Sequence, residues 1–80
     1  MKVKILLYGI ARDIIGDSKY EIDLKEGALV RNAMDSIKSS FPEFNRLTSL
    51  MIAINDEYAS DSDQINDGDT LVLIPPVSGG

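Results

Sequence analysis

The chain has 80 residues, of which 44% are apolar, and a formal net charge of −5. This length suffices for one small domain, and the excess of acidic side chains argues against nucleic acid as a partner, because phosphate binding needs clustered lysines and arginines. The chain contains no cysteine and no histidine, so it lacks the usual thiol nucleophile, general base and zinc ligands.

The first quarter of the sequence predicts two strands on either side of a short helical turn. Residues 2–8 alternate between the two faces of a strand. Residues 11–15 can form a helical turn, which Gly16 closes as a C-terminal signal. Residues 19–24 alternate again. The spacing predicts a hairpin with a wide loop.

The middle of the sequence changes to the period of an α-helix. Five apolar side chains fall on one helical face: Val30, Ala33, Met34, Ile37 and Phe41. Pro42 ends this helix. Gly27 and Ala28 stand where a Ser, Thr or Asp N-cap is expected, so we expect a helix start that is weaker by about 1 kcal/mol.

The remaining sequence predicts short strands separated by polar turns. These elements are a loop over residues 43–49, a buried strand over 51–54, a brief strand at 58–59, a polar loop over 60–64, a turn over 66–69 and a last strand over 70–74. Together with the single main helix, they predict an α+β domain in which a mixed sheet of four to five strands packs on that helix. Residues 1–74 would form this domain and residues 75–80 a tail.

Both the first and the last strand are apolar on both faces, as central strands tend to be. We therefore expect them to lie side by side as a parallel pair in the middle of the sheet. If Ile5 and Leu71 face the helix, the alternate side chains face away from it. These are Leu6, Tyr8, Val72 and Ile74. One helix covers one face, so we expect an exposed apolar patch, which marks an interface unless the surface is merely apolar.

The charges are distributed unevenly along the chain. All eight basic residues lie at or before Arg46, and the six acidic residues that follow it have no basic counterpart. This pattern favours a partner with a basic surface, unless the acidic loops serve solubility alone. From Asp61 onward the spacing departs from an EF-hand, because Ile65 and Val72 occupy ligand positions. No P-loop motif is present either, so we expect no metal and no cofactor bound by this chain.

No apolar run reaches the ~20 residues of a membrane span, and the N-terminal apolar stretch is too short for a signal peptide. We therefore expect a cytoplasmic protein without a membrane partner.

The C-terminal tail carries the sharpest functional signal. Pro75 and Pro76 favour a stiff, extended stalk, and Val77 supplies an apolar anchor. Gly79 and Gly80 have no side chains, so the end can thread a narrow channel. These features suit delivery of the terminal carboxylate into the active site of another protein. The alternative is a frayed terminus or a linker remnant.

Two stretches resemble one family. The end of the chain, from Asp67 to Gly80, resembles the C-terminal signature of the ThiS/MoaD sulfur carriers, above all MoaD, the small subunit of molybdopterin synthase. Residues 7–16 resemble the family's N-terminal pattern of an aromatic, a small residue, an Arg, an acidic residue and a Gly. Ser78 stands where Thr is common. The resemblance spans the chain and implies a β-grasp, ubiquitin-like fold.

The resemblance also implies a function as a carrier that is not an enzyme on its own. A MoeB-like (E1-like) enzyme would adenylate the carboxylate of Gly80 with ATP, and a sulfur donor would convert it to a thiocarboxylate. A MoaE-like large subunit, in a heterotetrameric synthase, would use that sulfur to make the dithiolene of molybdopterin. By position, the tail channel would be contacted by Pro75, Pro76, Val77, Ser78 and Gly79. The partners would bind Tyr8, Tyr58, Ile74, Leu6, Val72 and Arg12.

Three other functions stay open. A ThiS-like carrier would serve thiazole synthesis, although its tail normally lacks the diproline. A modifier of the archaeal small-modifier type would join Gly80 to lysines of target proteins. A plain β-grasp interaction module would have an incidental Gly-Gly end.

Overall fold

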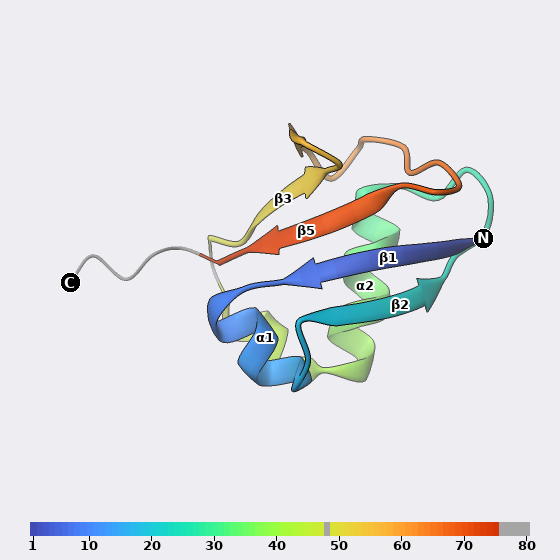
Figure 1. The fold of residues 1–80 in the computed structure, drawn as a ribbon. Coiled ribbons are helices and arrows are strands. Elements are labelled where there is room, and N and C mark those ends of the chain that lie inside the picture. Colours follow the sequence, from blue (N-terminus) through green and yellow to red (C-terminus); the bar gives the residue numbers. More distant parts are fainter. Residues whose placement is uncertain (48, 76–80) are drawn as a thin grey trace.

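The computed structural model describes residues 1–47 and 49–75. Within them the elements follow one another as β1 (Lys2–Leu7), α1 (Gly9–Ile15), β2 (Lys19–Asp23), α2 (Val30–Ser40), the 3-10 helix η1 (Pro42–Arg46), β3 (Met51–Ile54), β4 (Glu57–Ala59) and β5 (Thr70–Ile74) (Figure 1). The predicted strands and the main helix are therefore present at nearly the predicted positions.

The strands form one mixed sheet in the order β2-β1-β5-β3-β4. β1 and β5 run parallel at its centre, with Leu6 opposite Val72 and Leu7 opposite Leu73, and they point the same way in Figure 1. The other three pairings are antiparallel. The predicted parallel central pair is thus confirmed. Because β1 and β5 are parallel, the chain leaves both strands at the same edge of the sheet.

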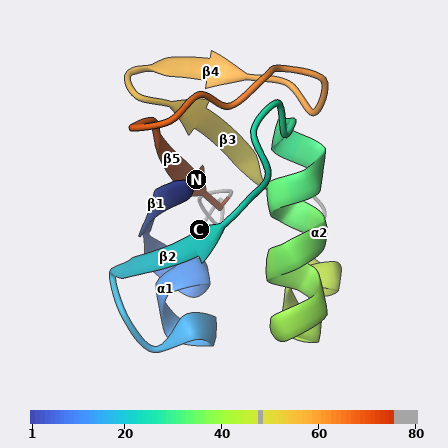
Figure 2. The same cartoon turned by 90° about the vertical axis from the view of Figure 1, so that its right-hand side faces the viewer.

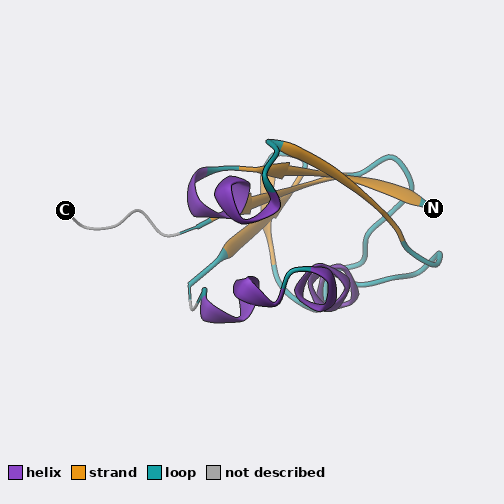
Figure 3. Cartoon of the chain, turned by 90° about the horizontal axis from the view of Figure 1, so that it is seen from below, coloured by secondary structure: helices purple, strands orange, loops and turns teal. Residues whose placement is uncertain are grey.

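The sheet and the main helix form two layers (Figures 2 and 3). α2 and η1 lie on one side of the sheet, and α1 lies at the end where β1 finishes (Figure 1). The largest fully buried side chains lie between the layers: Phe44, Ile5, Leu7, Ile37, Ile65, Leu71, Leu73, Val3 and Val30. This is the α+β arrangement that the sequence patterns predict and the β-grasp fold that the family resemblance implies.

Helix α2 lacks a Ser, Thr or Asp N-cap, as predicted, but its first amides have partners that the prediction did not include. Its N-cap residue is Leu29, whose side chain cannot accept a hydrogen bond. Instead, the backbone N–H of Val30 donates to the carbonyl of Asp63 at 2.9 Å, and that of Arg31 to the carbonyl of Asp61 at 3.0 Å. The side chain of Asn32 also accepts from the N–H of Leu29 at 2.8 Å. The polar loop therefore satisfies the first amides of the helix, which a local sequence motif would not reveal.

The stretch after α2 corrects the prediction of a loop over residues 43–49. Pro42–Arg46 form the 3-10 helix η1, with Pro42 in its first turn. Its Phe44 is completely buried and lies edge-on to Phe41, at 6.5 Å between ring centroids. A 3-10 helix of five residues is too short to show a helical period in the sequence, so this element is missed by the prediction.

Candidate functional site

The outer face of the sheet, opposite α2, carries a continuous apolar surface. The strand registers place Leu6 opposite Val72, Val72 opposite Ala53, and Ala53 opposite Tyr58. These four side chains therefore form one row across four strands. One step nearer the exit edge, Met51 lies opposite Ile74. We call the following set the outer patch: Leu6, Tyr8, Met51, Ala53, Tyr58, Val72 and Ile74.

Several members of the outer patch are unusually exposed for their size. Tyr58 is 72% exposed, Tyr8 54% and Met51 50%. Tyrosine and methionine are both common at protein interfaces, where tyrosine combines an apolar ring with a polar hydroxyl. The prediction that alternate residues of β1 and β5 face away from the helix is confirmed. The outer patch therefore has the composition of a docking surface.

Sequence reasoning missed two members of the outer patch. Met51 and Ala53 belong to β3, whose four residues are all apolar. An apolar run does not disclose which face is buried. The register with β5 settles the matter, because it places Ile52 opposite the buried Leu73 and so turns Met51 and Ala53 outward.

The tail starts beside the outer patch. Pro75, which is partly buried, directly follows β5. Ile74, the last residue of β5, belongs to the patch. The predicted tail residues Pro76, Val77, Ser78, Gly79 and Gly80 lie outside the described residues. Docking of a partner on the outer patch would therefore bring it next to the base of the tail.

Arg12 lies one helical turn after Tyr8 of the outer patch, and its backbone N–H donates to the carbonyl of Tyr8 at 3.4 Å. It lies in the last turn of α1 and is exposed. It is not among the residues that line the shallow depression over the outer patch. Within residues 1–47 and 49–75, the single ion pair joins Lys2 and Glu21, at 3.8 Å between Nζ and Oε1. The partner-binding role of Arg12 stays a prediction.

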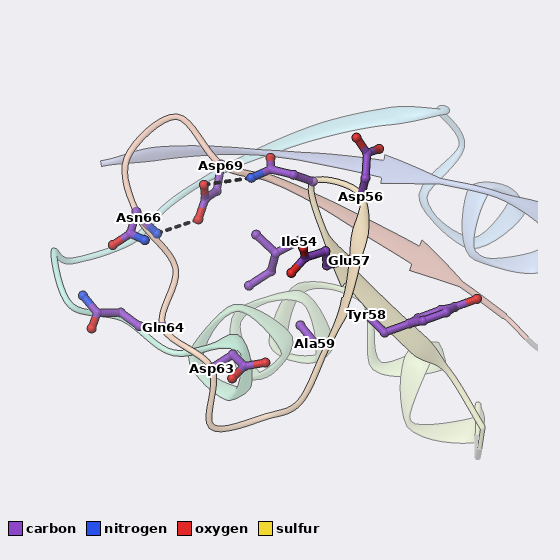
Figure 4. A pocket seen from close by; sticks show the side chains of 10 residues that line it. Ile54, Asp56, Glu57, Tyr58, Ala59, Asp63, Gln64, Asn66 and Asp69 are labelled. Carbon is purple, nitrogen blue, oxygen red and sulfur yellow. Dashed lines mark hydrogen bonds between the residues drawn. The ribbon is translucent and has the colours of Figure 1, made fainter.

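An acidic hollow adjoins the outer patch across β4 (Figure 4). Asp56, Glu57, Asp63 and Asp69 line it, and Tyr58 lines both the hollow and the depression over the patch. The hollow gathers four of the six acidic residues that follow Arg46, and the partner with a basic surface that the charge pattern favours stays a prediction.

Two of these carboxylates serve the local fold. Asp63 Oδ2 accepts from the N–H of Ser60 at 2.8 Å. Asp69 Oδ2 accepts from the N–H of Asn66 at 2.8 Å, and its Oδ1 from Asn55 Nδ2 at 3.2 Å (Figure 4). Asp56 and Glu57 have no hydrogen bond of their side chains within the described part of the chain. Of the carboxylates that line the hollow, those of Asp56, in the β3–β4 turn, and Glu57, at the start of β4, are therefore the ones available to a partner.

The described residues hold no group of three or more acidic side chains arranged for a metal ion. Among the same residues, no helix is long and apolar enough to cross a bilayer.

Comparison with known proteins places the chain in a family. The sequence matches the ThiS family over residues 5–80. The molybdopterin synthase sulfur carrier subunit of Dictyostelium discoideum is 36% identical, over 96% of this chain and 94% of that protein.

Two solved structures are similar over almost their whole length. The putative molybdopterin converting factor subunit 1 from Pyrococcus furiosus has a TM-score of 0.88 and 31% identity, over 96% of this chain and 99% of that one. SAMP1 from Haloferax volcanii has a TM-score of 0.88 and 25% identity, with full coverage of both chains.

A small β-grasp domain with an exposed apolar face beside its C-terminal tail defines the class of ubiquitin-like proteins. Within this class, the chain belongs to the ThiS family.

Proposed function

We propose that this chain is a sulfur carrier whose cargo is bound at the carboxylate of Gly80. The observation that carries the proposal is that β1 and β5 end at the same edge of the sheet, which puts Tyr8 and Ile74 of the outer patch beside the base of the tail. The family match, which extends to residue 80, supports it. A partner that docks on the patch would then receive the tail without any rearrangement of the domain.

The chemistry of the carboxylate requires an activating partner. A carboxylate is a poor electrophile, so its oxygen first attacks the α-phosphorus of ATP, and pyrophosphate leaves. Sulfur at the oxidation level of sulfide then attacks the acyl carbon and displaces AMP, which leaves a thiocarboxylate on Gly80. The ATP site belongs to a MoeB-like (E1-like) enzyme in this proposal. The chain has neither histidine nor cysteine, which suits a carrier that relies on its partners for catalysis.

The acceptor that we propose is a MoaE-like large subunit of molybdopterin synthase. The relative from Dictyostelium discoideum is named as the sulfur carrier subunit of that enzyme, and this supports the assignment. The sulfur of the thiocarboxylate would serve to build the dithiolene of molybdopterin. The tail residues Pro75 to Gly79 would line the channel of each partner, and the outer patch would bind both partners in turn, in the cytoplasm.

One alternative has a specific observation in its favour. The likeness to SAMP1, a small archaeal modifier protein, extends over the full chain at 25% identity. A modifier would form an isopeptide bond between the activated Gly80 carboxyl and a lysine of a target. Mass spectrometry of cell extracts for the C-terminal peptide attached to lysines distinguishes this function. A ThiS-like carrier would instead donate its sulfur to a thiazole-forming enzyme.

Deletion of Gly80 tests the carrier proposal. The shortened chain keeps the whole outer patch, so it should bind the large subunit with unchanged affinity but give a reconstituted synthase without dithiolene-forming activity. The full chain, loaded by the activating enzyme, is the matched control. Unchanged activity after the deletion would refute every function based on Gly80 and leave a plain interaction module.

A further inference from the structure

Gly9 lies beside Pro75, the base of the tail. It begins α1 and has a φ of +55°. A Cβ placed on Gly9 with ideal geometry would lie 3.2 Å from Cγ of Pro75. Carbon atoms prefer separations of about 3.5–4.0 Å, so a side chain at this position would push the Pro75 ring away. Gly9 therefore meets two separate requirements, a left-handed backbone and a close approach of another segment.

Three other glycines have the left-handed backbone without the close approach of another segment. Gly16, Gly27 and Gly68 also have positive φ, at 88°, 84° and 88°. A Cβ on any of them would have no atom within 4 Å. The first requirement alone thus explains these three positions. Among the glycines of the described residues, the second requirement is specific to Gly9, and the neighbour that imposes it is the first residue after β5.

The geometry of the central strands explains the contact. β1 and β5 pair in parallel up to Leu7 and Leu73, so Gly9 and Pro75 each follow two residues later at the same edge. The ring of proline fixes its φ near −65°. A displaced ring therefore turns the direction of the chain that follows, because the proline cannot absorb the displacement by rotation about φ.

We propose that Gly9 is a positioning residue, which sets the direction in which the tail leaves the domain. This inference rests on the proposed function of the tail. An extended chain of five residues spans up to about 17 Å. A turn of about 10° at Pro75 would therefore move its far end by about 3 Å, whereas a misplacement of about 1 Å can reduce a reaction rate about 100-fold.

The test compares Gly9→Asn with Gly16→Asn. Asparagine tolerates positive φ better than other residues with a Cβ, so both variants keep the backbone conformation, and only the change at Gly9 brings a side chain against Pro75. We expect similar melting temperatures. We expect the kcat of thiocarboxylate formation by the activating enzyme to fall at least about tenfold for Gly9→Asn and to stay within about twofold for Gly16→Asn. KM should change little, because the outer patch is intact.

A second substitution provides a rescue. Pro75→Ala removes the Cγ that a side chain at position 9 would meet. The double variant Gly9→Asn/Pro75→Ala should therefore be faster than Gly9→Asn, once the effect of Pro75→Ala alone is taken into account. Similar melting temperatures of Gly9→Asn and the double variant would show that the recovered rate is not a recovered stability. Equal kcat for Gly9→Asn and Gly16→Asn, or a double variant whose kcat equals the product of the two single effects, would overturn the proposal.

A measurement without sulfur chemistry separates this proposal from the carrier function. Residual dipolar couplings report the mean orientation of backbone amides. The couplings of residues 77–80 should change in Gly9→Asn and remain as in the wild type in Gly16→Asn. If the wild type takes up no sulfur, the carrier function fails, and these couplings decide whether Gly9 directs the tail. If the wild type takes up sulfur but the couplings and kcat are alike in both variants, the positioning role alone fails.

Discussion

The two faces of the sheet are built from similar residues, but the inner face is buried and the outer face is partly exposed. On the inner face, Ile5 and Leu71 are completely buried against α2. On the outer face, Leu6 and Val72 are their immediate neighbours in the chain and lie only partly buried. Hydrophobicity alone therefore does not distinguish core from docking surface. What distinguishes them is that a single main helix can cover one face, so that the apolar side chains of the other face are available to a partner.

The largest expected effect is the loss of stability when a side chain of the inner face is shortened. Leu71→Ala removes a completely buried side chain and should lower the free energy of unfolding by about 2–5 kcal/mol. Urea denaturation followed by circular dichroism measures it. Val72→Ala, one residue away on the outer face, is the control and should cost about 1 kcal/mol or less. Equal losses would show that both faces belong to the core.

Substitution of the exposed tyrosines tests the outer face. Tyr58→Ala and Tyr8→Ala should each weaken binding of the large subunit by about tenfold or more, which is about 1.4 kcal/mol. Their free energy of unfolding should change by about 0.5 kcal/mol or less, because both side chains are more than half exposed. Isothermal titration calorimetry measures the affinity. Variants that unfold would identify these rings as structural.

The acidic hollow also contains two kinds of carboxylate, those that stabilise the local fold and those that are available to a partner. Asp69→Ala removes the acceptor of two hydrogen bonds, from Asn66 and Asn55, and should lower stability by about 1 kcal/mol. Thermal unfolding measures this loss. The rate of association with the partner should stay within about twofold, since the charge lies beyond the patch. A slower association without loss of stability would contradict this assignment.

The smallest expected effect concerns Asp56, in the turn between β3 and β4, and Glu57, at the start of β4. Asp56→Asn and Glu57→Gln should leave stability unchanged and slow association with a basic partner a fewfold at low salt. The difference from the wild type should shrink as the ionic strength rises. Stopped-flow mixing at two salt concentrations measures it. A partner that associates equally fast with the variants at low salt would show that the acidic residues serve solubility.

The sequence predicts those parts of this molecule that depend on local patterns. The alternation in β1 and β5 and the helical period from Val30 onward depend on neighbouring residues, so the central parallel pair and four of the seven members of the outer patch could be inferred. The remainder depends on contacts between distant segments. The amides of Val30 and Arg31 are satisfied by a loop more than 29 positions away.

The same reason explains what was missed in the site. Met51 and Ala53 take their orientation from the register with β5, which an apolar run of four residues does not encode. The contact of Gly9 with Pro75 joins opposite ends of the chain. A sequence shows that a glycine is present, whereas the structure shows which atom occupies the space beside it.

The most direct test of the central claim is the intact mass of the chain after incubation with the activating enzyme, ATP and a sulfur source. The chain has no cysteine, so added sulfur has no thiol on which to form a persulfide. We predict that the mass rises by the difference between one sulfur and one oxygen atom, and that a chain without Gly80 shows no change. An unchanged mass of the full chain, or the same increase without Gly80, would contradict a sulfur carrier that works through its terminal carboxylate.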